Sequence, residues 1–187
     1  MKFIKFFLFL IIFLLEVTNG FSQHSLVKIP YPVNTDDLDE ICPVVSYDES
    51  TLFFTRVADY QCERTLFIDS VNVHLTLNEA QYLEKLQYVY NQLASSPIKE
   101  PLKSGYNQDI WYSKLKNGQT EGIYHPGYPI NDVLPNSICS NYGKTNTFLV
   151  INQFDPHGGI ERGFSVAEKH GNDFTFVRLF TCSGSEY

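Results

Sequence analysis

The sequence predicts an all-β fold of antiparallel strands, arranged as about two propeller-type blades in an incomplete ring, with one helical insertion. The first observation is a weak internal repeat at a spacing of 97 positions. Ile41-Cys42 returns as Ile138-Cys139, and Leu52-Phe53-Phe54 returns as Leu149-Val150-Ile151. Second, aromatic and β-branched runs alternate with Asn, Asp and Gly turns, which is typical of short antiparallel strands. Third, one stretch between the repeats has helical periodicity instead.

Composition limits the class of protein. With 187 residues, 43% apolar and 19% charged, the chain suits one globular domain and is too apolar for a disordered one. A net charge of −7 argues against non-specific nucleic-acid binding, which needs basic groups to neutralise phosphates. The apolar run Phe6–Leu15 is too short to span a bilayer. Four cysteines are too few for a disulfide-dense miniature protein.

The N-terminus has the layout of a secretory signal peptide. Two lysines precede the apolar run Phe6–Leu15, and small residues stand at the −3 and −1 positions of a cut before Gln23. We therefore expect residues 1–22 to be removed on export to the periplasm or outer membrane, leaving residues 23–187 as a propeller-like repeat region. The nearest cysteine after the run is Cys42, so a lipid anchor is not expected.

The first unit has about twice the length of a blade. Strands are expected around Ile41 and Leu52–Phe54, with a further strand at Asp109–Leu115. The excess, about residues 57–106, reads as an insertion with one helix of about five turns. Thr76 and Glu79 fit a capping box. The apolar stripe that follows consists of Leu77, Ala80, Leu83, Leu86, Tyr90 and Leu93, and it stops at Ser95-Ser96-Pro97.

Two uses of this helix remain open. The insertion either packs its own stripe on the blade face or docks a partner through Tyr82, Tyr88 and Tyr90. The first is favoured, because most amphipathic stripes serve a core.

The second unit runs from Ile138 to Phe180, which is 43 residues and close to one propeller blade of roughly 40–45. Because Ile-Cys recurs in register, Cys42 and Cys139 are expected at equivalent strand positions and buried. In an oxidising compartment the four cysteines allow three pairings, and a Cys62–Cys182 bridge stays open. No pair has the C-x-x-C spacing of a zinc or thioredoxin-type site.

These segments resemble bacterial TolB-type, WD-repeat-like propellers. Ile41–Thr55 is similar to the family's Pro-x-hydrophobic-Ser-x-Asp-Gly-x-x-Leu-hydrophobic-Phe strand pair, although Asp48-Glu49 replaces its Asp-Gly turn. Asp109–Ser113 is similar to its Asp-Ile-Tyr/Trp strand, and Gly163–Ser165 to part of a next blade. The resemblance extends over roughly Val33–Arg56 and Asp109–Val177. Such blades often precede an outer-membrane-protein-A-like domain that binds peptidoglycan, so the resemblance implies an exported protein- or wall-associated module.

Motifs that approach catalytic patterns are incomplete. Gly163–Ala167 lacks the last glycine of a nucleophile elbow, and Ser165 is expected to be a strand residue. Ser96–Lys99 has no β-lactamase-type partner motifs, and Gly143–Thr145 lacks the first glycine of a phosphate loop. The five histidines have no metal-like spacing. The acidic turn of Asp36, Asp37, Asp39 and Glu40 lacks the glycine and bidentate glutamate of a calcium loop. No catalytic, cofactor-binding or metal residue is assigned, and no cofactor is expected.

The leading hypothesis is a non-enzymatic envelope module with an unknown envelope or peptidoglycan-associated protein partner. Trp111, Tyr112, Tyr124 and Tyr128 would supply contact area at its surface. The alternatives are a propeller fragment of an exported hydrolase or peptidase, and a truncated product without its own function. Two blades cannot close a ring, so residues 23–187 are expected to self-associate or to unfold readily.

Overall fold

The computed structural model describes residues 27–154 and 160–180. Strands and one α-helix make up most of this part of the chain, and the N-terminal segment of residues 27–38 precedes the first strand. The elements are β1 (Asp39–Val45), β2 (Thr51–Val57), β3 (Phe67–Ile68), β4 (Val71–Asn72), η1 (Val73–Leu75), α2 (Glu79–Ala94), η2 (Pro101–Lys103), β5 (Gln108–Lys116), β6 (Gln119–Tyr124), β7 (Ser137–Asn141), β8 (Thr147–Phe154), β9 (Ile160–His170) and β10 (Asp173–Phe180).

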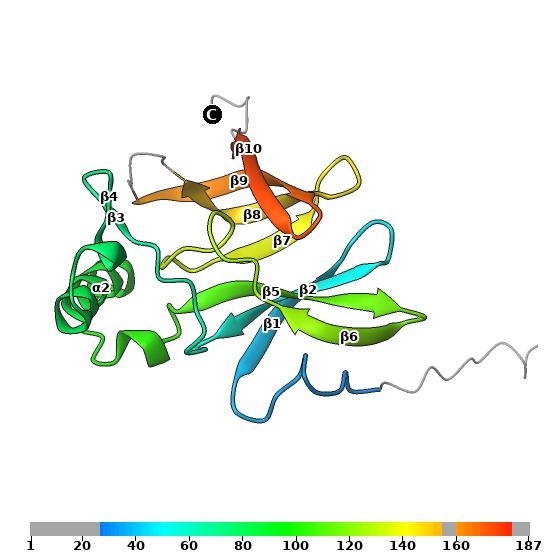
Figure 1. Ribbon diagram of the computed structural model, residues 1–187, viewed down its shortest axis with the longest axis horizontal. Helices are drawn as coiled ribbons and strands as arrows, with labels where there is room; N and C mark the ends of the chain where they lie inside the picture. The colour runs from blue at the N-terminus through cyan, green and yellow to red at the C-terminus, as the bar shows by residue number, and fades with distance from the viewer. Residues whose placement is uncertain (1–26, 155–159, 181–187) are drawn as a thin grey trace, which may run out of the picture.

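The strands form two four-stranded antiparallel sheets, which lie one above the other in Figure 1. The first sheet has the order β1-β2-β5-β6 and the second has β10-β9-β8-β7, so each follows the chain from strand to strand. A small pair, β3-β4, lies apart from both. The predicted fold class, antiparallel blade-like sheets with one helical insertion, is confirmed.

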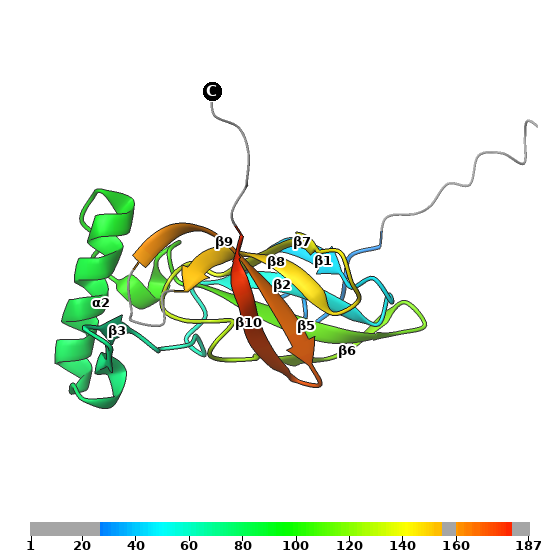
Figure 2. The same ribbon diagram turned by 90° about the horizontal axis from the view of Figure 1, so that it is seen from above.

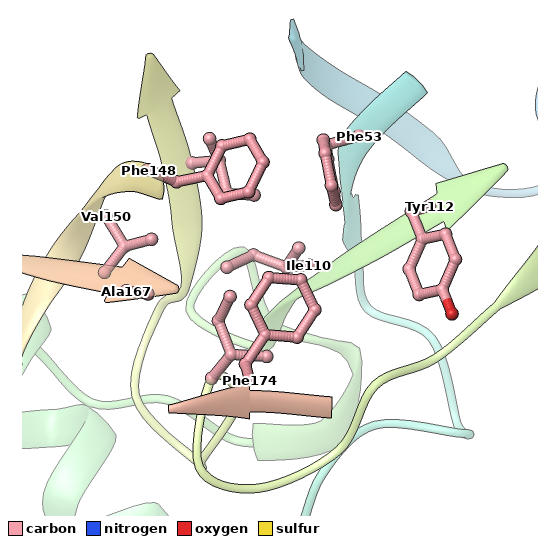
Figure 3. Close-up of a cluster of buried hydrophobic side chains, with 9 residues drawn as sticks. Phe53, Ile110, Tyr112, Phe148, Val150, Ala167 and Phe174 are labelled. Carbon is pink, nitrogen blue, oxygen red and sulfur yellow. The ribbon is translucent and has the colours of Figure 1, made fainter. Parts of the chain in front are cut away.

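One shared core joins the two sheets. Phe53, Ile110 and Tyr112 from the first sheet meet Phe148 and Phe174 from the second in a single buried cluster (Figure 3). The rings of Phe53 and Phe148 make an edge-on contact with centroids 4.7 Å apart. Because side chains alternate between the two faces of a strand, each sheet turns its opposite face away from this core.

The internal repeat corresponds to equivalent strands. Ile41-Cys42 lies in β1 and Ile138-Cys139 in β7, the first strands of the two sheets, while Phe53 of β2 and Val150 of β8 both enter the shared core. Each cysteine lies at a break in the pairing register with the next strand, as in a β-bulge.

The prediction that Cys42 and Cys139 are buried is wrong: both side chains are exposed. Cys42 has a positive φ of 52°, a backbone conformation that reorients its side chain relative to regular β-strand neighbours. Cys139 is skipped in the pairing of β7 with β8. The bulges therefore interrupt the alternation on which the prediction relied.

The helix lies within the segment that separates β2 from β5. These two strands pair directly, with Val57 opposite Gln108, so the intervening residues leave the sheet and return to it. Both views place α2 at one end of the two sheets (Figures 1 and 2). The helix ends at Ala94, and Ser95 follows in a left-handed conformation.

The helix begins two residues later than a cap at Thr76 implies. Asn78 is the N-cap: its side chain accepts from the Gln81 N–H at 3.1 Å, and the Gln81 side chain accepts from the Asn78 N–H at 3.3 Å. Thr76 instead ends the preceding 3-10 turn, and its hydroxyl donates to the carbonyl of Val73. Thr76 already has a right-handed helical conformation, whereas an N-cap residue needs extended backbone.

The apolar stripe of α2 packs into a second core, built from the insertion itself and from the connection between β6 and β7. The hydroxyl of Tyr82 donates to the carbonyl of Arg64, and that of Tyr90 to the carbonyl of Val133. Of the three tyrosines considered for docking, only Tyr88 is exposed. Residues buried in this core are Leu66, Val73, Tyr82, Leu86, Val89, Tyr90, Val133 and Leu134.

Candidate functional site

The outer face of the second sheet carries exposed apolar side chains. Ile151 of β8 pairs directly with Phe164 of β9, and their exposed fractions are 43% and 42%. Their neighbours Val150 and Ser165 are buried. Since neighbouring residues point to opposite faces, the Ile151–Phe164 pair lies on the face away from the shared core. It is an apolar cross-strand pair in contact with water.

The outer face of the first sheet is partly covered by the N-terminal segment 27–38. Val33 from this segment packs on Leu52, Phe54 and Trp111 of the sheet. Beside it runs a groove of about 660 Å³, whose sheet-side lining includes Val45, Leu52 and Leu115. The segment therefore leaves part of this apolar face open.

Arg56 anchors the same segment to the sheet. Its guanidinium lies 3.3 Å from the Glu40 carboxylate and 3.4 Å from that of Asp59, and it donates to the carbonyl of Pro32. It also lies over the Trp111 ring, 4.9 Å from the centroid. Arg56 is only 5% exposed, so this set of contacts compensates a charge removed from water.

The aromatic residues considered for partner contact separate into two groups. Trp111 and Tyr112 are buried, which corrects their predicted place at a contact surface. They are neighbours in β5 and point to opposite faces of the sheet, so Trp111 packs on the outer face and Tyr112 packs in the shared core. Tyr124 and Tyr128 are 39% and 47% exposed and remain accessible.

A polar junction forms where β5, the end of β6 and the β6–β7 connection meet. Asp109 is 2% exposed, and its carboxylate lies 2.8 Å from Nε2 of His125. Asn131 bonds both backbone groups of Ile110, accepting from the N–H at 2.8 Å and donating to the carbonyl at 2.9 Å. Its side-chain nitrogen also lies 3.1 Å from His125 Nε2. Burial raises the pKa of Asp109, while the His125 contact and the backbone N–H of Glu63 oppose the rise.

Two further acids complete the junction. Glu63 accepts from the backbone N–H of Tyr128 at 3.1 Å and from the Thr65 hydroxyl at 2.7 Å, and so ties the insertion to the β6–β7 connection. Loss of hydration raises the pKa of Asp132 to about 7, although it accepts hydrogen bonds from the Leu134 N–H and the Asn136 side chain. The junction positions chain segments through backbone contacts.

The thiol of Cys62, close to this junction, is poorly suited to nucleophilic attack. Burial, and secondarily the charge of Asp109, raise the pKa of Cys62 to about 11. A thiol of that pKa is almost entirely protonated at neutral pH, whereas the thiolate is the nucleophile.

The catalytic near-matches lie in different elements of the fold. Ser165 is a buried residue of β9, Ser96–Lys99 follows α2, and Gly143–Thr145 forms the turn between β7 and β8. Glu40 of the acidic turn is engaged by Arg56 and Thr35. Among the described residues there is no group of three or more His, Cys, Asp or Glu side chains able to hold a metal ion.

Sequence reasoning missed the Asp109–His125 pair. In the sequence Asp109 belongs to a strand motif and His125 has no metal-like spacing, so neither pattern predicts their contact. The polar residues Asp109, His125 and Asn131 are separated by 6 to 22 positions, and no motif spacing joins them. The signal that the sequence offers is an aspartate at the start of a predicted strand, directly before apolar residues, because a polar group buried there needs a hydrogen-bond partner.

No protein family, curated protein or solved structure matches this chain. In the part of the chain that the structure describes, no helix is both long and apolar enough to cross a membrane.

Proposed function

We propose that the chain is a non-enzymatic interaction module of the bacterial cell envelope, exported by its N-terminal signal and associated with a protein or wall component. The outer face of its second sheet, β10-β9-β8-β7, binds the apolar face of another twisted β-sheet. In the absence of a partner protein, a second copy of the chain supplies that sheet.

The observation that carries this proposal is the exposed Ile151–Phe164 pair on the face opposite the shared core. Twisted sheets pack face to face at a spacing of about 10 Å, with interdigitated side chains. The molecule already uses this arrangement once, through Phe53 and Phe148. A second twisted apolar sheet is therefore the surface most complementary to the exposed face.

The chemistry of the polar groups supports a binding role over catalysis. Asp109, Glu63 and Asn131 are engaged by backbone groups of neighbouring segments. The raised pKa of Cys62 keeps this thiol protonated at neutral pH.

The test compares self-association of the mature chain with that of two variants. Phe164→Asp places a charge on the proposed face, and the matched control Tyr88→Asp places one on α2, where Tyr88 is 63% exposed. We expect the wild type and the control to form dimers or larger species in size-exclusion chromatography with light scattering. The Phe164→Asp variant should associate at least about tenfold more weakly, because an unpaired charge would be buried in the interface.

Circular dichroism of each variant checks that the fold is retained. If the wild type and both variants are equally monomeric over the whole concentration range, the face does not bind a second sheet and the proposal fails. If Tyr88→Asp weakens association as much as Phe164→Asp does, the interface lies elsewhere.

A further inference from the structure

The first strands of the two sheets, β1 and β7, lie against each other between two fixed contacts. At one end Asn141 of β7 donates from its side chain to the carbonyl of Val45 at 2.8 Å. At the other end Thr55, which pairs with Ile41 of β1, donates to the Ser137 hydroxyl of β7 at 3.0 Å. Both strands run in the same direction between these contacts.

Cys42 and Cys139 occupy this interval. Cys42 follows Ile41 directly, and Cys139 is two residues after Ser137, so the two contacts bracket both thiols. Both side chains are exposed and are not linked in a disulfide in the structure, and both lie at bulges that leave them out of the regular pairing. Loss of part of its hydration raises the pKa of Cys139, and the Cys42 thiol adds to the rise, in agreement with the two contacts that bracket both cysteines.

We propose that Cys42 and Cys139 form a disulfide that joins the first strands of the two sheets when the protein meets a disulfide oxidant. One thiolate attacks oxidised glutathione and forms a mixed disulfide, releasing one glutathione thiolate. The second thiolate then attacks the protein sulfur of the mixed disulfide and releases the other glutathione. The two cysteines lose two electrons and two protons, and oxidised glutathione becomes two glutathione thiols.

This bond is independent of the proposed sheet-face partner, since it lies within one chain. It would close a loop that contains the whole insertion, and cross-links across long loops restrict the unfolded chain most. We therefore expect the oxidised protein to unfold at a temperature at least about 5 °C higher than the reduced protein.

The experiment uses the mature chain, reduced and then incubated with a glutathione redox buffer at pH 8.5, where more thiolate is present. A Lys or Arg lies between every pair of neighbouring cysteines, so trypsin places the four cysteines in different peptides. Mass spectrometry without reduction should find the peptide with Cys42 linked to the peptide with Cys139. Cys42→Ser should abolish the link and the rise in unfolding temperature, while the control Cys62→Ser should retain both.

The proposal is overturned if Cys42 and Cys139 remain free in the folded, oxidised protein, or if Cys42 is linked to Cys62 or Cys182 instead. Wild-type mapping decides this without any variant. A monomeric protein that forms the bond would refute the sheet-face proposal and leave the disulfide standing.

Discussion

Replacing Phe53 by leucine removes one of the two rings that make an edge-on aromatic contact between the two sheets. Phe53 is fully buried, and its ring meets that of Phe148 edge-on at 4.7 Å. Such a pair contributes about 0.5–1.5 kcal/mol beyond the area that it buries. We expect Phe53→Leu and Phe148→Leu each to lower the free energy of unfolding by roughly 1–2 kcal/mol. The double variant should lose less than the sum, by about 0.5–1.5 kcal/mol.

The assay is urea unfolding of the four proteins at one fixed protein concentration, with the slope of the transition checked for constancy. Phe54→Leu is the matched control, because Phe54 is the next residue of β2 and is also buried, but on the outer face. Combined with Phe148→Leu it should give additive losses within about 0.5 kcal/mol. Coupling of Phe148 to Phe54 and not to Phe53 would refute the assignment of the shared core.

Three further predictions concern single groups. At pH 7.5 Asp132→Asn should be more stable than the wild type. The pKa of Asp132 is about 7 in the folded state and near 3.8 in the unfolded state, so the free energy of unfolding of the wild type falls as the pH rises between these values. Urea unfolding at pH 4.5 should show the advantage shrinking, and a wild type that gains on the variant as pH rises would contradict this. Asn78→Ala should cost about 1 kcal/mol in the same assay and Thr76→Ala less, since Asn78 is the cap; the reverse order would restore the cap to Thr76. Alkylation of Cys62 in the folded protein at pH 8 should be roughly a hundredfold slower than in urea, because its pKa is about 11, and equal rates would refute its burial.

The arrangement of strands could be predicted because each strand carries its own local pattern. Phe53 and Val150 are equivalent residues of the repeat, and both enter the core between the sheets. The insertion could be predicted because the spacing of its apolar residues changes from the period of a strand to that of a helix. Pairing of β2 with β5 follows once that insertion is set aside.

Features that depend on exceptions to the pattern were not predictable in the same way. Cys42 is exposed because a bulge interrupts the alternation, and nothing in an Ile-Cys pair signals a bulge. The sequence predicts Trp111 at a contact surface, but the N-terminal segment and Arg56 cover its ring. The contact between Asp109 and His125 arises from tertiary structure, where residues of different segments meet.

The predicted signal peptide, residues 1–22, lies outside the described residues and stays a prediction, as does any disulfide of Cys182. Sequencing of the exported protein should begin at or near Gln23, and an intact Met1 in a cytoplasmic pool would contradict export.

Thermal unfolding of residues 23–187, followed by light scattering over a range of protein concentrations, tests most directly whether the outer sheet faces need a partner. With Ile151 and Phe164 exposed on one sheet and an open groove on the other, we predict association before or during unfolding, with a transition that shifts with concentration. A sharp, reversible and concentration-independent transition from a monomer would contradict the account, because the two sheets would then form a complete domain without any partner.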